Sequence, residues 1–174
     1  MLDQIINFFN SPFMIIVGGL STLLVLIGAI YSMWHVLTGV VPIWIRLGKG
    51  LSKSTIAIFS NNQYNSLQSM IVDSKIFKAN NIIHITKQDL KKAAGASVFL
   101  VHWKDFQNDM HDILALKKDN TALIIYAPQN EGRIEDQDLL NKIDRERNSV
   151  LVNFRGRLMN DILTSLITVN YEQR

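Results

Sequence analysis

The chain of 174 residues contains no cysteine, which excludes several kinds of chemistry at once. Disulfide bonds, a thiolate nucleophile, cysteine-ligated zinc and iron–sulfur clusters all require that side chain. Any folded domain must therefore be held together by its core alone. Familiar catalytic and nucleotide-binding motifs are missing too: there is no G-x-G-x-x-G, no Walker A motif, no H-E-x-x-H and no G-x-S-x-G.

An excess of charge is also missing. The chain has 18 basic and 15 acidic residues, a formal net charge of +3. This charge is too small to indicate nucleic acid, so we expect no DNA or RNA duplex as a partner. His84, His102 and His111 do not have the spacing of a helical metal pair. We expect no metal and no resident cofactor, with His84 in a strand and His111 on a helix surface.

What the sequence has instead is one long uncharged run. Residues 13–41 contain no Asp, Glu, Lys or Arg, and their one ionisable side chain is His35. A helix rises about 1.5 Å per residue, so about 20 apolar residues cross the hydrocarbon core of a bilayer. We therefore predict a transmembrane helix, with Ser11 as its cap and Pro12 in its first turn.

The charges that flank this run predict its direction. Residues 1–12 carry no Lys or Arg, and the run is too long for the apolar region of a cleavable signal peptide. Arg46, Lys49 and Lys53 follow it closely, and short flanks rich in Lys and Arg stay in the cytoplasm. We expect a single-pass protein of the inner membrane, with its N-terminus outside and its C-terminal domain in the cytoplasm.

Three parts are predicted along the chain. Residues 1–46 form the anchor, 47–54 a short interfacial linker and 55–174 a cytoplasmic domain. Pro42, helped by Gly39, is expected to end or kink the anchor helix, because proline removes a helical hydrogen bond.

Small and weakly polar residues fall on one stripe of the anchor at spacings of 3, 4 and 7. In lipid, such stripes let helices approach and pack, so we predict a homo-oligomer in contact with membrane lipid. Two alternatives stay open: glycine is common in membrane helices anyway, and Ser32 and His35 could face a water-filled interior. The stripe consists of Gly18, Ser21, Gly28, Ser32, His35 and Gly39.

Beyond residue 54, short apolar runs alternate with amphipathic stretches, which indicates a parallel α/β sheet covered by helices on both faces. For so short a domain we predict the flavodoxin-like strand order 2-1-3-4-5. The runs are nearly all apolar, as in strands buried on both faces. The expected strands are 55–59, 82–85, 97–103, 122–126 and 149–154, and the expected helices are 64–77, 88–94, 106–114, 136–147 and 157–169.

Ligands of such sheets bind at the carboxyl ends of the strands. The turn from Arg155 to Arg157 enters a helix there, and a helix N-terminus with two arginines suits a phosphate or carboxylate. The alternative is that these arginines pair with Glu131, Glu135 or Asp161 at the surface. The loop of residues 60–63 offers uncharged hydrogen-bond donors to a ligand. Alternatively, it caps the helix that follows. The predicted ligand-binding residues are Ser60, Asn61, Asn62, Lys104, Arg133, Arg155, Gly156 and Arg157.

The segment DLKKAAGASVFLVHWKDFQNDMHDILALKKDNTALIIYAP resembles the central part of a TIR-type domain. In that family a helix ends just before a strand that reaches the binding edge. The NAD-cleaving members place a catalytic Glu on the helix after the third strand. The resemblance implies that Asp109 or Asp112 would be the catalytic carboxylate here, because that helix has no Glu.

A second resemblance concerns the arrangement of the whole chain. A membrane helix followed by a small α/β sensor looks like the membrane effectors of prokaryotic antiviral systems, including those with a Rossmann-like CARF sensor. It implies a cyclic oligonucleotide or other nucleotide as the ligand.

Three hypotheses follow. The first is a membrane-anchored effector that binds an anionic nucleotide and perturbs the membrane by rearranging its helices. The others are a tethered NAD-cleaving enzyme and a non-catalytic interaction domain.

Overall fold

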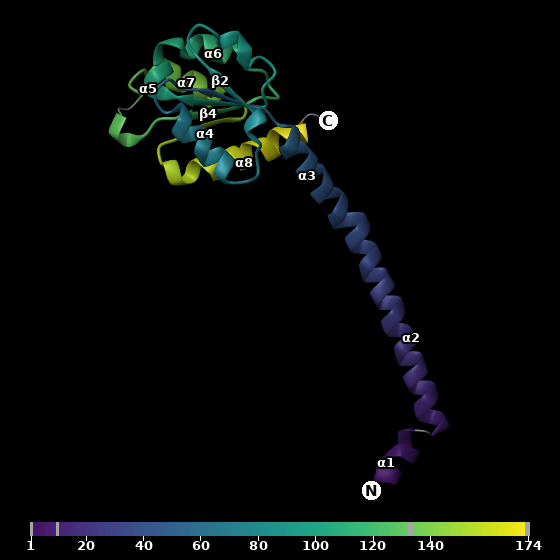
Figure 1. Ribbon diagram of the computed structural model, residues 1–174. Helices are drawn as coiled ribbons and strands as arrows, with labels where there is room; N and C mark the ends of the chain where they lie inside the picture. The colour runs from purple at the N-terminus through teal and green to yellow at the C-terminus, as the bar shows by residue number, and fades with distance from the viewer. Residues whose placement is uncertain (1, 10, 132–133, 173–174) are drawn as a thin grey trace. The chain divides into compact units, whose positions relative to one another are not determined.

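The computed structural model describes residues 2–9, 11–131 and 134–172 (Figure 1). The chain divides into two units, Met1–Arg46 and Leu47–Arg174, and each is described by itself below.

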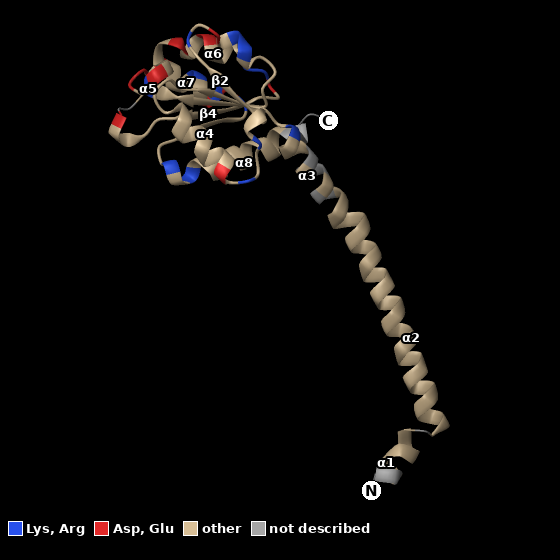
Figure 2. Cartoon of the chain, viewed as in Figure 1, with Lys and Arg blue, Asp and Glu red and all other residues tan. Residues whose placement is uncertain are grey.

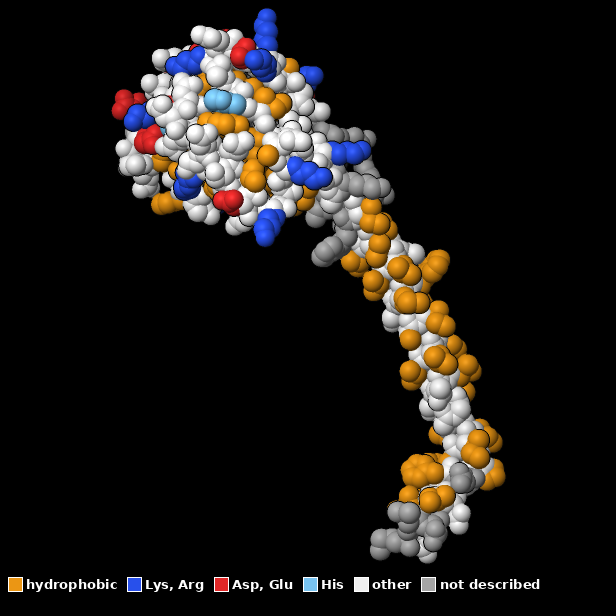
Figure 3. Space-filling view, viewed as in Figure 1, with side chains coloured by type: hydrophobic (Ala, Val, Ile, Leu, Met, Phe, Trp, Pro, Cys, Tyr) orange, Lys and Arg blue, Asp and Glu red, His pale blue; other side chains and the backbone are white. Residues whose placement is uncertain are grey.

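The first unit is helical. It contains α1 (Leu2–Phe9), α2 (Pro12–His35), the π-helical turn η1 (Val36–Val40) and the start of α3 (Val41–Lys53). Ser11 caps α2 as expected: its Oγ accepts a hydrogen bond from Met14 N at 3.4 Å. The stretch Pro12–Val40 has a mean hydropathy of 2.5 and is long and apolar enough to cross a membrane. Figure 2 shows no Lys, Arg, Asp or Glu position along α2, and Figure 3 shows hydrophobic side chains gathered along it.

The helix does not end at Pro42, so that part of the prediction is wrong. Helical structure continues from η1 into α3 and reaches Lys53, so most of the segment predicted as a linker is helix. The backbone N–H of Val41 donates to Val36 O, five residues back. The ring of a proline crowds the carbonyl four residues before it, and a wider turn relieves that crowding without breaking the helix.

The second unit is the predicted α/β domain. Its five strands are all parallel and lie in the order β2-β1-β3-β4-β5, which confirms the predicted topology. At the centre of the sheet, Ile56 pairs with Val98 and Phe59 with Val101. The strands are β1 (Ile56–Phe59), β2 (Ile82–Ile85), β3 (Val98–His102), β4 (Ala122–Tyr126) and β5 (Ser149–Val152).

Helices cover both faces of this sheet (Figure 1). One core cluster packs α4 and α8 against one face, and the other packs α5, α6 and α7 against the opposite face. The larger helices are α4 (Tyr64–Asp73), α6 (Met110–Leu116), α7 (Gln137–Arg145) and α8 (Arg155–Glu172); the shorter turns are η2 (Ala79–Asn81), η3 (Leu90–Ala93), α5 (Trp103–Phe106), η4 (Gln107–Asp109) and η5 (Gln129–Glu131).

Burial differs between the centre and the edges of the sheet. Strands β1, β3 and β4 are buried at every residue, as expected from their composition. The edge strands depart from that expectation: His84 in β2 is exposed, and Leu151 in β5 is 42% exposed. An edge strand has a neighbour on one side only, so a run of apolar residues does not guarantee burial there.

Two predicted boundaries are corrected near the carboxyl edge. Trp103 was predicted to end the third strand but begins α5, so helical structure starts immediately after β3. Residues 153 and 154 lie beyond β5, and α8 begins at Arg155, two residues earlier than predicted. Both shifts bring helix starts closer to the strand ends, where the candidate site lies.

Candidate functional site

The last residue of β3, His102, lies between two carboxylates. Its Nδ1 is 3.0 Å from Asp105 Oδ2, and its Nε2 is 2.9 Å from Glu131 Oε2. The histidine side chain is 2% exposed and those of Asp105 and Glu131 are 9% and 17% exposed. Neither ring nitrogen is aligned well enough for a standard hydrogen bond, so these are close polar contacts.

Asp105 also binds the loop that follows β1. Its Oδ2 accepts hydrogen bonds from Ser60 Oγ at 3.0 Å, Asn61 N at 2.8 Å and Asn62 N at 3.3 Å. These are the donors that the sequence assigns to a ligand. In the structure they surround an internal carboxylate instead, so the loop already holds an anion.

The pKa of Asp105 reflects these contacts. Burial alone would raise the pKa of this carboxyl, because it disfavours the charged form. The hydrogen bond from the Asn61 backbone, followed by the contacts with His102 and Ser60, outweighs burial and holds the pKa below its ordinary value. Asp105 is therefore a charged residue that holds the loops together.

Further contacts join the neighbouring loops. Gln63 Nε2 donates to Glu131 Oε1 at 2.6 Å, which links the segment after β1 to the one after β4. His84 Nε2 donates to the carbonyl oxygen of Ser60 at 2.7 Å, and the ring of Tyr64 stacks on His84 with centroids 3.9 Å apart. The ends of β1, β2, β3 and β4 are thus tied together by side chains.

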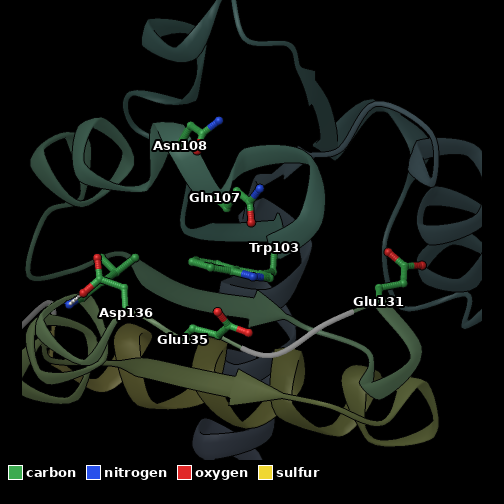
Figure 4. A pocket seen from close by; sticks show the side chains of 7 residues that line it. Trp103, Gln107, Asn108, Glu131, Glu135 and Asp136 are labelled. Atoms are coloured by element: carbon green, nitrogen blue, oxygen red, sulfur yellow. Dashed lines mark hydrogen bonds between the residues drawn. The ribbon is translucent and has the colours of Figure 1, made fainter.

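Beside this cluster is an open hollow of about 440 Å³ (Figure 4). Trp103 lies between Gln107 and Glu135 in that view, and Glu131 lies at one side. Trp103 is 7% exposed and so forms part of the floor. The hollow is lined by Trp103, Gln107, Asn108, Glu131, Glu135, Asp136 and Leu139.

The chemistry of the hollow favours one part of a nucleotide over another. Its apolar floor suits a flat ring, amides can pair with the edge of a base, and acidic side chains bind ribose hydroxyls in many dinucleotide sites. Its carboxylates repel phosphate. Ser60 Oγ and His102 are both engaged in internal contacts, so the cluster positions loops and does not present a free nucleophile or base.

The other predicted ligand-binding residues do not gather at one point. Arg155 Nη2 donates to Ser66 O at 2.9 Å and to Ser66 Oγ at 2.6 Å, on the side of the sheet covered by α4 and α8. Arg157 Nη2 is 3.9 Å from Asp161 Oδ1, the surface pairing considered as the alternative, and remains 74% exposed. Lys104 and Gly156 are exposed. Arg133 lies outside the described residues.

The two carboxylates that the TIR resemblance points to lie on the helical segment after β3. Asp109 Oδ2 is buried, lacks a hydrogen-bond partner and is 3.8 Å from Lys87 Nζ. Asp112 is exposed on α6. Across residues 2–9, 11–131 and 134–172, no group of three or more His, Asp or Glu side chains is arranged to hold a metal ion.

The sequence predicts a site in the loops at the carboxyl edge of the sheet but does not predict the cluster of His102, Asp105 and Glu131. From the sequence alone, His102 is considered only as a metal ligand, Glu131 is considered only as a partner of the arginines, and Asp105 is assigned no role. The available signal was a histidine at a strand end, an aspartate three residues later and a glutamate after the neighbouring strand. No family model, curated protein or solved structure matches the chain.

Proposed function

We propose that the chain is a membrane-anchored sensor and effector. The α/β domain binds a nucleotide-type signal at the carboxyl edge of its sheet, and the anchor helices of several copies associate and perturb the membrane. By its resemblance to prokaryotic membrane effectors, its role is in antiviral defence, with the domain on the cytoplasmic side of the inner membrane.

The observation that best supports this proposal is the hollow around Trp103. The domain that contains it follows a helix long and apolar enough to cross a membrane. The hollow is lined by residues that follow β3 and β4, at the carboxyl edge of the sheet where ligands of doubly wound sheets bind. A base and ribose fit its amides and carboxylates, whereas the phosphates must point away from Glu135 and Asp136. Lys104 is exposed next to Trp103 in the chain and is a suitable cation for them.

A second candidate, a non-catalytic interaction domain, is favoured by the open edge of the sheet. Leu151 on β5 and Phe154 just beyond it are 42% and 57% exposed. Exposed apolar residues at a sheet edge suit strand addition by a partner. A partner captured equally well with and without nucleotide would favour this candidate over the first.

Binding can be followed by the fluorescence of Trp103. A Trp34→Phe, Trp44→Phe variant leaves Trp103 as its one tryptophan. Titration with ATP, NAD and cyclic dinucleotides in detergent is expected to change its emission saturably for at least one of them. Glu135→Ala and Gln107→Ala should each weaken that binding about tenfold, the loss of one hydrogen bond to a ligand.

The matched control is Gln88→Ala, an exposed amide outside the hollow. It should leave the affinity unchanged. If none of these ligands alters the emission, or if Glu135→Ala binds as tightly as the parent, the ligand part of the proposal is wrong.

Association of the anchors can be tested because the chain has no cysteine. A single Ser32→Cys variant in lipid vesicles is expected to form dimers with a short bis-maleimide, since Ser32 lies on the predicted stripe. Ile30→Cys lies about 160° away on the helix and should crosslink several-fold less. Equal crosslinking at the two positions would contradict association through the stripe.

A further inference from the structure

The first helix, α1, is amphipathic, with one apolar face and one polar face. Ile5, Ile6 and Phe9 fall on one face at helical spacing, and Gln4 and Asn7 lie on the other. Phe8 flanks the apolar face, and its ring meets that of Phe9 edge-on with centroids 5.6 Å apart. This face was not part of the span that the sequence predicts, which begins at residue 13.

Nothing among the described residues covers this face. Ile5, Ile6 and Phe9 are 52%, 48% and 61% exposed, and Phe8 is 60% exposed. A helix of eight residues is too short to be stable alone in water, where isolated helices need about 12–15 residues. An amphipathic helix of this length forms when its apolar face is buried against something else.

The bilayer is the surface against which the apolar face of α1 can be buried. α2 begins at Pro12, so only two residues separate it from the end of α1 at Phe9. The two are separate helices, because Ser11 caps α2 and Pro12 has no N–H to continue the hydrogen bonding of α1. The end of a membrane span lies at the boundary of headgroups and acyl chains, which suits an apolar face buried shallowly beside a polar one.

We propose that α1 is an interfacial helix that binds the lipid surface at the start of the span. Ile5, Ile6 and Phe9 enter the acyl boundary, and Gln4 and Asn7 face the headgroups. Because residues 1–12 contain no Lys or Arg, binding does not depend on anionic lipid, unlike that of basic amphipathic helices. The helix then holds Pro12 at a fixed depth.

The inference rests on α2 lying in a bilayer, as proposed above, and one experiment can separate the two. Single cysteines at Ile6, Asn7 and Val25 of the full chain carry a nitroxide label in phosphatidylcholine vesicles. Collision with oxygen, which concentrates in lipid, is compared with collision with a water-soluble nickel chelate. The oxygen-to-nickel ratio at Ile6 should exceed that at Asn7 by about threefold or more, and Val25 should give the highest ratio.

The accessibility of the three labels separates failure of the membrane span from failure of the inference about α1. If Val25 is accessible to nickel, α2 does not span and the proposed function fails. If Val25 is protected while Ile6 and Asn7 are equally open to nickel, α1 lies in water and only the present inference fails. If Ile6 and Asn7 are both immobile and shielded, a second copy covers α1, which also overturns it.

A second measurement does not depend on labelling α1 at its apolar face. Repeating the Asn7 experiment with about one third phosphatidylglycerol should leave its ratio within about twofold, because no basic side chain draws the helix to anionic lipid. A larger rise in the ratio would show electrostatic binding and contradict the proposed mode.

Discussion

Replacing Leu24 and Ile27 together by arginine is expected to remove the protein from membranes. Both positions lie in the middle of α2, and each arginine there costs about 2.5–3.5 kcal/mol on insertion scales. Two of them offset most of the apolar contribution of the helix. After alkaline extraction of membranes, the wild-type chain should stay in the pellet and the double variant should move to the soluble fraction or be degraded.

The control is the same pair replaced by alanine, which shortens the side chains without adding charge. Leu24→Ala with Ile27→Ala should remain in the pellet, because many apolar residues of the span are unchanged. Retention of the arginine variant in the pellet after alkaline extraction would show that α2 is not the element that holds the chain in the membrane.

Replacing Asp105 by alanine is expected to destabilise the α/β domain by about 2–4 kcal/mol. The substitution leaves the hydroxyl of Ser60 and the N–H groups of Asn61 and Asn62 without their acceptor, and leaves buried His102 with one carboxylate neighbour. Urea unfolding of the full chain in detergent, followed by Trp103 emission in the Trp34→Phe, Trp44→Phe background, measures the loss.

Asp144→Ala is the matched control, since Asp144 is an exposed carboxylate in the last turn of α7. It should change stability by less than about 0.5 kcal/mol. Equal unfolding curves for Asp105→Ala and Asp144→Ala would show that the contacts around Asp105 contribute no net stability.

The stability difference between wild type and Asp105→Ala should also depend on pH. The folded-state pKa of Asp105 lies below its ordinary value of 3.8, so folding favours the charged form. The resulting stabilisation is complete above that value and is lost as the pH falls through the folded pKa. The difference between the two unfolding midpoints should therefore be constant near pH 5 and shrink below about pH 4.

The sheet could be predicted from the sequence because its central strands follow one simple rule. Runs such as 122–126 are apolar at every residue, and a strand buried on both faces requires that. Strand length and the alternation with helices then restrict the strand order. The rule is weaker at an edge, which is why the exposure of His84 and Leu151 did not follow from it.

The candidate site was predictable only as a set of loops. Ser60, Asn61 and Asn62 were correctly recognised as a group of donors, but sequence spacing did not show which acceptor they meet. Asp105 is 44 residues away from Asn61, and only the pairing of β1 with β3 brings them together. The role of Pro42 was missed for a local reason: a helix can widen by one residue before a proline and continue.

Because β1 is short, the end of α3 and the Ser60 loop are close in the sequence. Only Ser54 and Thr55 separate α3 from β1, and only four residues separate Thr55 from Ser60, whose hydroxyl contacts Asp105. Asn81 Nδ2 donates to Ser52 O, and Leu51 packs on the core, so the end of α3 is fastened to the domain. The end of α3 and the Ser60 loop therefore lie at opposite ends of one four-residue strand that is buried in the sheet.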